Sequence, residues 1–223
     1  MVKFTVIGGD ASSDLAKRIA RKLNATYIKT QKKSFPDGES KITINQIPKK
    51  SIVVVVQSTN PPVDANLLEL LSIVSKVQKF SSKVYAIIPY MGYARQDREF
   101  LDGEIVTIRV VGKLLRALGV KKVLTVDIHS KLALKGLKIP SENVSAMEEL
   151  VKHFKKIKIK NPLVVSPDLG GKERAKQFAT LLKTDFIALK KHRDRKTGKV
   201  KILSGKVEVK NRNLIIVDDM IST

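Results

Sequence analysis

The sequence predicts an α/β protein with mainly parallel sheets. Apolar runs of strand length alternate with stretches whose apolar residues recur at helical spacing, an order typical of βαβ units. The runs are nearly continuous in Val, Ile and Leu, which indicates strands covered by helices on both faces. The predicted strands are Phe4–Gly8, Ile52–Gln57, Val84–Pro89, Val123–Asp127, Leu163–Ser166, Phe186–Leu189 and Leu214–Asp219.

Three helices are predicted from apolar stripes. The first runs from Leu15 to Leu23 and follows Ser12-Ser13-Asp14, a group that can cap a helix. The second is ended by Gly119, and the third begins after Gly170-Gly171. Their apolar members are Ile105, Ile108, Val111, Leu115 and Leu118 in the second, and Ala175, Phe178, Ala179 and Leu182 in the third.

The segment Tyr27–Ile44 departs from this alternation. Its Pro36-Asp37-Gly38 turn joins two short alternating segments, so we expect a β-hairpin there. A new strand–helix series starts after the turn expected at Pro140–Asn143. We therefore expect two domains, residues 1–144 and 145–223.

Composition indicates a globular protein of the cytoplasm. Hydrophobic residues make up 43% of the chain, yet there is no secretory h-region and no apolar run near membrane-spanning length. Cysteine is absent, which excludes disulfides and cysteinyl metal sites. A net charge of +22 attracts phosphates, nucleotides and nucleic acid alike. Because the basic residues are spread along the chain without a recognition motif, we expect neither nucleic acid nor a membrane as partner.

Charged side chains gather just beyond the carboxyl ends of five predicted strands, where open parallel sheets bind ligands. A single case would be an ordinary strand-to-loop transition, but five together indicate a site. The clusters are Arg95-Gln96-Asp97-Arg98, Asp127 with His129, Asp168, Lys190-Lys191-His192-Arg193 and Asp218-Asp219.

The acidic clusters suit metal and sugar binding, although each has a structural alternative. Asp127 and His129 would face the same side of an extended strand and could hold a divalent ion, or His129 could orient its own loop. Asp218 and Asp219 could accept hydrogen bonds from vicinal sugar hydroxyls or bind Mg²⁺ through water, or they could be acids at a helix N-terminus. Gly170-Gly171 would let backbone N–H groups approach an anion.

Two basic segments and one aromatic residue suit a polyphosphate nucleotide. Arg95–Arg98 carries two guanidinium forks, which fit either phosphate contact or a salt-bridged surface loop. Lys190–Lys199 contains Thr197-Gly198, as expected of a mobile flap, or is only a solvated basic loop. Phe35 at the hairpin tip could stack on a base or fill the hairpin's own core. The sequence has no Walker A, Gly-x-Gly-x-x-Gly or HExxH pattern, which excludes a P-loop kinase, a Rossmann dehydrogenase and a zincin.

Several motifs occur in a specific order along the whole chain. They are Phe35-Pro36-Asp37-Gly38-Glu39, Pro89-Tyr90-Met91-Gly92-Tyr93-Ala94-Arg95-Gln96-Asp97-Arg98, Asp127-Ile128-His129-Ser130, Ser166-Pro167-Asp168-Leu169-Gly170-Gly171-Lys172, Lys191-His192-Arg193 and Val217-Asp218-Asp219-Met220-Ile221. Together they resemble the ribose-phosphate diphosphokinases, or phosphoribosyl-pyrophosphate (PRPP) synthetases, in their short archaeal-type form. The Asp-Asp motif alone would suit any type I phosphoribosyltransferase.

The resemblance implies two flavodoxin-like domains of the type I phosphoribosyltransferase kind, the first with an ATP-binding hairpin and loop and the second incomplete at residue 223. It implies transfer of the diphosphoryl group of MgATP to the C1 hydroxyl of ribose 5-phosphate, giving PRPP and AMP. It also implies Mg²⁺ as cofactor and a homo-oligomer with the ATP site at a subunit interface. The alternatives are a noncatalytic regulatory homologue, which should lose flap or metal residues, and a PRPP-using phosphoribosyltransferase, which would not need the hairpin, His129 or the flap.

The same resemblance implies four groups of site residues. The catalytic pair is Lys191 and Arg193, and the ATP-binding residues are Phe35, Asp37, Glu39, Arg95, Gln96 and His129. The metal residues are Asp127, His129 and Asp168, and those that bind ribose 5-phosphate are Asp168, Asp218, Asp219, Ser222 and Thr223.

The sequence departs from the family pattern in two places. Lys138 precedes Ile139-Pro140 where many members have an acid, so no metal role is expected there. The family's 5-phosphate loop continues past Thr223. We therefore expect this 223-residue segment to bind MgATP but to bind ribose 5-phosphate poorly, with negligible turnover.

Overall fold

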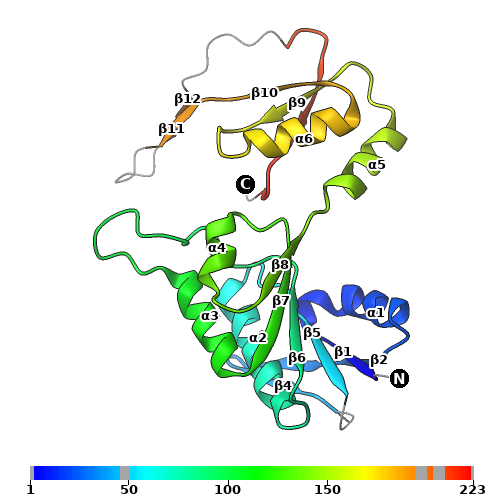
Figure 1. The fold of residues 1–223 in the computed structure, drawn as a ribbon, viewed down its shortest axis with the longest axis vertical. Helices are drawn as coiled ribbons and strands as arrows, with labels where there is room; N and C mark the ends of the chain where they lie inside the picture. Colours follow the sequence, from blue (N-terminus) through cyan, green and yellow to red (C-terminus); the bar gives the residue numbers. More distant parts are fainter. Residues whose placement is uncertain (1–2, 46–50, 194–199, 203–208, 222–223) are drawn as a thin grey trace. The chain divides into compact units, whose positions relative to one another are not determined.

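The computed structural model describes residues 3–45, 51–193, 200–202 and 209–221, with only the backbone described for 191–193 and 200–202. The chain forms two compact units, Met1–Val144 and Ser145–Thr223, called unit 1 and unit 2 below (Figure 1). Each unit has its own sheet and its own buried core.

Unit 1 is built on a six-stranded sheet in the order β2-β1-β5-β6-β7-β8. All neighbouring strands run parallel, so their carboxyl ends lie at the same edge of the sheet. The strands are β1 (Phe4–Gly8), β2 (Thr26–Lys29), β5 (Ile52–Val56), β6 (Val84–Ile88), β7 (Val120–Val126) and β8 (Ser141–Val144).

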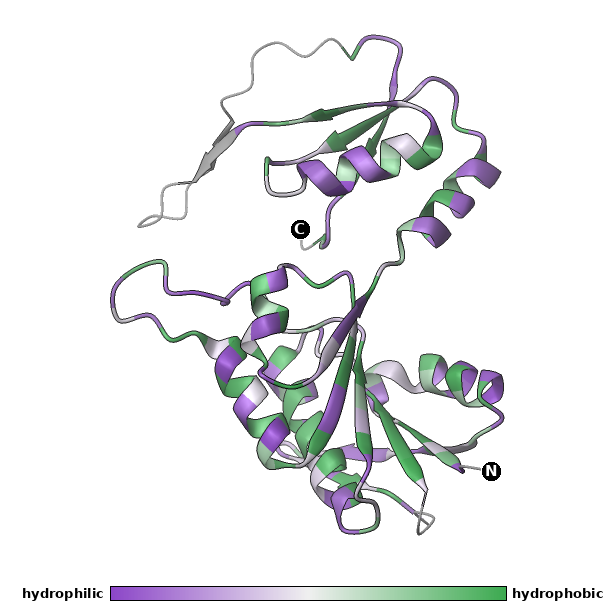
Figure 2. Cartoon of the chain, in the orientation of Figure 1, coloured by the Kyte–Doolittle hydropathy of each residue, from purple (hydrophilic) through white to green (hydrophobic). Residues whose placement is uncertain are grey.

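Helices cover both faces of this sheet. Helix α1 (Ser13–Lys22) packs on the face that carries Val6 and Val54, while α2 (Val63–Gln78) and α3 (Thr107–Ala117) pack on the face that carries Ile7. Figure 1 shows α1 on one side of the sheet and α2 and α3 on the other. The central strands are apolar and the outer helix surfaces hydrophilic (Figure 2). Alternate residues of β1 and β5 thus feed two separate cores, as a doubly covered sheet requires.

Unit 2 has a three-stranded parallel sheet, ordered β10-β9-β13. Its core includes Phe178 of α6, which meets Phe154 of α5 edge to face with ring centroids 5.4 Å apart. The bounds are α5 (Met147–Ile157), β9 (Pro162–Ser166), α6 (Lys172–Leu182), β10 (Asp185–Ala188) and β13 (Asn213–Ile216). A separate antiparallel pair joins β11 (Lys191–Arg193) to β12 (Val200–Ile202).

The structure confirms the predicted α/β class with mainly parallel sheets, and it corrects several elements. Tyr27 belongs to β2, which pairs with β1, so the hairpin is shorter than expected. Most of the turn expected at Pro140–Asn143 is strand β8, the polar edge strand of the first sheet. Ile105 lies outside α3 and is exposed. Helix α2 was not predicted, because buried Asn66 and Glu69 interrupt its apolar pattern.

The predicted cap of α1 is also wrong in its detail. Ser12 is the N-cap residue but makes no side-chain capping bond. Its Oγ instead accepts a hydrogen bond from the Ser58 N–H at 2.9 Å. The hydroxyl therefore holds the segment after β1 against the segment after β5. Among the described residues, no helix has both the length and the apolar character needed to cross a membrane.

A buried ion pair attaches the hairpin strand β3 (Gln31–Ser34) to helix α2. Lys32 Nζ lies 3.2 Å from Glu69 Oε2, and the Asp10 N–H donates to Glu69 Oε1 at 2.7 Å. The Glu69 side chain is fully buried. Because Lys32→Met leaves that carboxylate without its cation, we expect a loss of about 1.5–3 kcal/mol in the free energy of unfolding, measured with urea. The matched variant Lys122→Met breaks the exposed Lys122–Glu142 pair and should cost less than about 1 kcal/mol. Equal losses of unfolding free energy in the two variants would show that the burial of Glu69 does not strengthen its ion pair.

Candidate functional site

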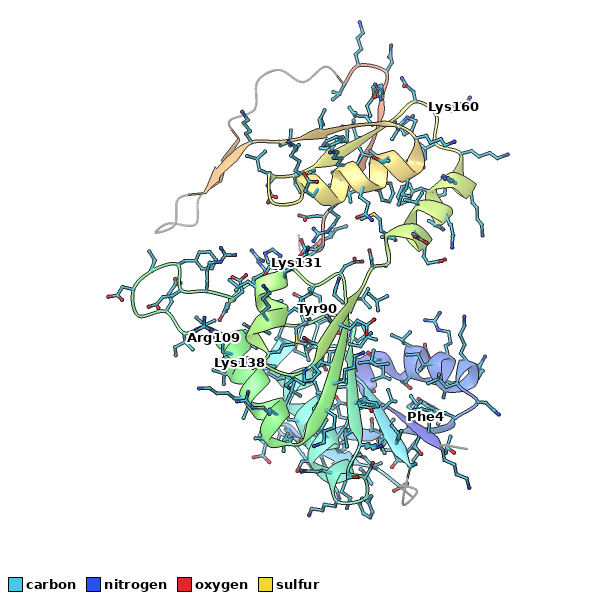
Figure 3. The ribbon with its side chains drawn as sticks, viewed as in Figure 1. Phe4, Tyr90, Arg109, Lys131, Lys138 and Lys160 are labelled. Carbon is cyan, nitrogen blue, oxygen red and sulfur yellow. The ribbon has the colours of Figure 1, made fainter. Side chains whose placement is uncertain are left out.

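The carboxyl edge of the unit 1 sheet carries closely hydrogen-bonded loops. Thr59 Oγ1 donates to the Tyr90 carbonyl at 3.0 Å and accepts from the Gly92 N–H at 2.7 Å. A Cβ on Gly92 would lie 2.7 Å from a methyl of Val63, so this close approach needs glycine. In Figure 3, Tyr90 and Lys131, the first residue of α4 (Lys131–Gly136), lie toward this edge, and Phe4 at the start of β1 lies toward the opposite one.

The hairpin presents Phe35 at a tight turn between β3 and β4 (Ser40–Thr43). The Gly38 N–H donates to the Phe35 carbonyl at 3.0 Å, and the Glu39 N–H donates to Asp37 Oδ1 at 3.0 Å. Phe35 is 37% exposed, and Lys33 Nζ lies 5.5 Å from the centroid of its ring. The ring does not fill a hairpin core, so one of its two predicted roles is wrong. It is accessible to a flat partner such as a purine.

The two arginines of the Arg95–Arg98 segment differ in their surroundings. Arg98 forms a paired contact with Asp97, with Nε 3.1 Å from Oδ1 and Nη2 3.2 Å from Oδ2, so it acts as the salt-bridged loop residue. Arg95 is exposed. Gln96 Oε1 accepts a hydrogen bond from Thr107 Oγ1 at 2.5 Å, which ties the segment to the start of α3. Arg95 is therefore the guanidinium that suits a phosphate.

Asp127 and His129 follow β7, but the argument that they face the same side is wrong. The strand ends at Val126, and Asp127 takes a left-handed conformation with φ +42°. Its N–H still donates to the Val144 carbonyl at 2.9 Å, but the left-handed φ turns the chain away from an extended path. Asp127 is half-buried and His129 is exposed. Their metal role stays a prediction.

In unit 2, three acidic residues gather where β9 and β13 end. Asp168 Oδ1 accepts the Gly171 N–H at 2.9 Å, so the anion that this N–H contacts in the structure is a carboxylate of the chain itself. A Cβ placed on Gly171 would lie 2.6 Å from Ser166 Oγ, so the turn has no room for a side chain at this position. The same Cβ would lie 3.6 Å from Asp218 Oδ1 and 3.8 Å from Asp168 Oδ1, which places these two carboxylates beside one glycine. Asp219 lies next to them, since its N–H donates to Asp218 Oδ1 at 2.9 Å.

Arg174 completes this acidic cluster, and sequence reasoning missed it. Its Nη1 lies 3.3 Å from Asp218 Oδ1 and 3.0 Å from Asp219 Oδ1. Burial, together with the hydrogen bond and charge of Asp219 and the charge of Asp168, still raises the pKa of Asp218 above its ordinary value. The only signal in the sequence for Arg174 was its position three residues after Gly171, in the first turn of α6.

The described residues contain no group of three Asp, Glu or His side chains placed to hold a metal by themselves. Mg²⁺ does not need such a group, because it keeps several waters and takes one or two carboxylates plus substrate phosphates. Burial and the neighbouring carboxylates of Asp219 and Asp168 raise the pKa of Asp218, and Arg174 already pairs with Asp218 and Asp219. An acidic site of this kind is favoured by a bound cation. The residues therefore fit Mg²⁺ bound together with a phosphate ligand.

The remaining predicted residues are only partly described. Lys191 and Arg193 lie in β11, whose backbone alone is described, and the flap residues 194–199 lie outside the described ranges. Ser222 and Thr223 lie outside them as well. Unit 1 contains Phe35, Asp37, Glu39, Arg95, Gln96, Asp127 and His129, and unit 2 contains Asp168, Lys191, Arg193, Asp218 and Asp219.

The fold of unit 2 is of the phosphoribosyltransferase type. A family model described as the N-terminal domain of ribose phosphate pyrophosphokinase matches residues 4–119, and the phosphoribosyl transferase domain matches residues 140–223. The chain is also similar in fold to the crystal structure of phosphoribosylpyrophosphate synthetase from Mycobacterium smegmatis. That likeness has a TM-score of 0.80 and 24% identity over 97% of this chain and 71% of the other.

Comparison with curated relatives identifies the family. The ribose-phosphate pyrophosphokinase of Methanobrevibacter smithii is 35% identical over 98% of this chain and 76% of the relative. The protein of that name from Pasteurella multocida is 39% identical over 100% of this chain and 72% of the relative. The chain belongs to the ribose-phosphate pyrophosphokinase family, also called the PRPP synthetases.

Proposed function

We propose that this protein transfers the diphosphoryl group of MgATP to the C1 hydroxyl of ribose 5-phosphate, giving PRPP and AMP. Family membership supports the reaction. The observation that carries the assignment to this chain is the acidic cluster of Asp168, Asp218 and Asp219 at the carboxyl edge of the unit 2 sheet. Carboxylates at such an edge can accept hydrogen bonds from the hydroxyls of a sugar.

In the proposed division of labour, residues 1–144 form the ATP domain. Phe35 would stack on adenine, Asp37 and Glu39 would contact the base, and Arg95 and Gln96 would hold the polyphosphate with His129. The exposed ring of Phe35 and the exposed guanidinium of Arg95 support these roles. In this family scheme the ATP site is shared with a neighbouring subunit, so we propose a homo-oligomer.

Residues 145–223 form the proposed sugar domain. Asp218 and Asp219 would accept hydrogen bonds from the ribose hydroxyls, and Arg174 holds both carboxylates in place. Ser222 and Thr223 would contact the 5-phosphate. Asp168 would serve both the sugar and a metal ion, and Asp127 and His129 would serve a metal beside ATP. Bound Mg²⁺ would neutralise phosphate charge and polarise the reacting phosphoryl group.

The proposed chemistry is an in-line attack of the sugar C1 oxygen on the β-phosphorus of ATP, with AMP as the leaving group. Such transfer depends on positioning and charge neutralisation rather than on a covalent enzyme intermediate. Lys191 and Arg193 would stabilise the negative charge that develops at the β-phosphoryl group. Their flap would also exclude water, which protects ATP from hydrolysis. The cytoplasm, where such phosphorylated substrates are found, is the proposed location.

The sequence also argues against the two alternatives. A noncatalytic regulatory homologue should lack flap or metal residues, whereas Lys191, Arg193, Asp127 and His129 are all present. A phosphoribosyltransferase that uses PRPP with a base would not need the Phe35 hairpin or the Lys-x-Arg pair. The overall reaction is tested by supplying ATP, Mg²⁺ and ribose 5-phosphate to the full-length protein and identifying the products.

Replacing Phe35 tests the ATP half of the proposal. Because base–aromatic stacking is worth about 1–3 kcal/mol, Phe35→Ala should raise the KM for ATP by about tenfold and leave the KM for ribose 5-phosphate nearly unchanged. Steady-state kinetics with each substrate varied in turn measures both constants. The Phe35→Tyr variant keeps a flat ring and should behave like the wild type.

The same variant tests the proposed subunit interface. If the stacking residue and the flap belong to different subunits of one site, an oligomer mixed from Phe35→Ala and Lys191→Ala chains should regain part of the activity. A mixture no more active than the sum of its parents would place each complete site within one chain. Equal rises of the two KM values would instead show that Phe35 acts on folding.

A further inference from the structure

Asp97 is a buried carboxylate that no proposed substrate contact uses. It lies in the loop after β6, next to Gln96, and only 2% of its surface is exposed although both neighbours in sequence are exposed. The Arg98 guanidinium contacts both of its oxygens, at 3.1 Å and 3.2 Å. A third group, Ser130 Oγ, donates to Asp97 Oδ2 at 2.5 Å. The Arg98 side chain is 55% exposed, so the carboxylate, not the guanidinium, is the buried member of this ion pair.

Ser130 belongs to the other loop of the proposed ATP site. It directly follows His129 and is the N-cap residue of α4, where its Oγ accepts the Ala133 N–H at 3.0 Å. One hydroxyl thus donates to Asp97 and accepts from the helix. The loop after β7 is thereby joined to the loop after β6, 33 residues earlier in the chain.

The charge of Asp97 strengthens this connection. Burial alone would raise the pKa of Asp97, but hydrogen bonds from Arg98 and Ser130 and the positive charge of Arg98 bring it below its ordinary value. The carboxylate therefore stays ionised at neutral pH, and both contacts are charge-assisted hydrogen bonds, which are stronger than neutral ones. Gln96, the residue before Asp97, accepts a hydrogen bond from the Thr107 hydroxyl, so it is also fixed to the start of α3.

We infer that Asp97 is a positioning residue for nucleotide binding, which fixes the Arg95-Gln96 segment and His129 relative to each other through Ser130. The inference rests on the proposed assignment of Arg95, Gln96 and His129 to ATP. Asp97 itself touches no substrate. It acts by holding two loops in one arrangement before ATP arrives, so its loss should weaken ATP binding and leave sugar binding unaltered.

The test compares four single variants of the full-length protein and the double variant that combines Asp97→Asn with Ser130→Ala. Asp97→Asn keeps the shape of the side chain and removes its charge, and Ser130→Ala removes the hydroxyl. Ser130→Thr keeps the hydroxyl and the helix cap. Glu142→Gln is the matched control, since it makes the same carboxylate-to-amide change in the exposed pair with Lys122. Calorimetric titration gives the Kd for MgATP, steady-state kinetics gives the two KM values, and thermal melting shows which variants fold.

Asp97→Asn and Ser130→Ala should each raise the Kd and KM for ATP by about tenfold or more, since each removes a hydrogen bond to a charged group. Their KM for ribose 5-phosphate should stay at the wild-type value, and Ser130→Thr and Glu142→Gln should behave like the wild type. Because both changes break the same contact, the double variant should be little worse than either single one.

The outcomes separate this inference from the proposed function. If the wild type neither binds MgATP nor forms AMP, the proposed function itself fails. The positioning role is overturned if the wild type is active but Asp97→Asn has the same Kd and KM for ATP as Glu142→Gln. It is also overturned if Asp97→Asn raises the KM for ATP and the KM for ribose 5-phosphate equally. If Asp97→Asn does not fold, the contrast between Ser130→Ala and Ser130→Thr decides. Equal ATP constants in those two variants would overturn the role.

Discussion

Replacing Lys191 or Arg193 by alanine is expected to lower kcat by about 10²–10³-fold in the full-length protein, the loss seen when one preorganised donor to a developing charge is removed. The physical reason is that each cation is proposed to neutralise charge that appears only in the transition state. Such an interaction lowers kcat more than it raises KM. Single-turnover measurements with saturating ATP and ribose 5-phosphate would isolate the chemical step.

The matched control is Lys156→Ala, which removes an exposed cation from α5 of the same unit and should leave kcat unchanged. Thermal melts of the three variants check that the fold survives. Near-wild-type kcat in both Lys191→Ala and Arg193→Ala would remove the catalytic role from the flap and would favour a merely solvated basic loop.

Replacing Asp218 by asparagine should weaken sugar binding and stabilise the fold at the same time. Loss of a charged acceptor for a ribose hydroxyl is worth about 1.5–3 kcal/mol, so the KM for ribose 5-phosphate should rise by about 10- to 150-fold. The KM for ATP should change little. Asp185→Asn is the matched control, because it makes the same change in an exposed carboxylate of unit 2 that pairs with Arg212.

The stabilising effect follows from the sign of the pKa shift at Asp218. Burial and the neighbouring Asp219 and Asp168 raise the pKa of Asp218 in the folded protein above its unfolded value. Between these two values the folded state binds more protons than the unfolded state, so stability falls as the pH rises through this range. At neutral pH the ionised group therefore costs stability, and asparagine removes that cost.

Thermal melting at several pH values measures this effect. The melting temperature of Asp218→Asn should be at or above that of the wild type at pH 7, and the advantage should shrink once the pH falls below the ordinary aspartate range. A variant less stable than the wild type at pH 7 would mean that the ion pair with Arg174 outweighs the repulsion between the carboxylates.

The parts of the fold that were predicted correctly are those encoded locally. The strand Phe4–Gly8 was predicted with the bounds observed, because only Thr5 interrupts its apolar residues and the strand is buried on both faces. Helix α2 was missed because Glu69, which looks like a surface residue, is buried against Lys32 of the hairpin. Strand β8 was missed because an edge strand can remain polar. In both cases a distant contact overrides the local pattern.

The same distinction between locally encoded features and distant contacts applies to the candidate site. Residue types at strand ends predicted a site at Asp168, Asp218 and Asp219, which the structure brings together, and their roles stay predictions. Sequence could not reveal the contact of Arg174 with the last two, because it joins residues more than 40 positions apart. The left-handed turn at Asp127 was also hidden, since aspartate carries no local requirement for that conformation.

The central claim is most directly tested by following the phosphorus atoms of ATP. The full-length protein is incubated with ATP, Mg²⁺ and ribose 5-phosphate, and the products are identified by ³¹P nuclear magnetic resonance. Diphosphoryl transfer predicts AMP and PRPP in equal amounts, with the β- and γ-phosphorus of ATP still joined and attached to C1 of the sugar. Formation of ADP with a singly phosphorylated C1, or an ATP signal that stays unchanged while added PRPP is consumed with a base, would contradict the account.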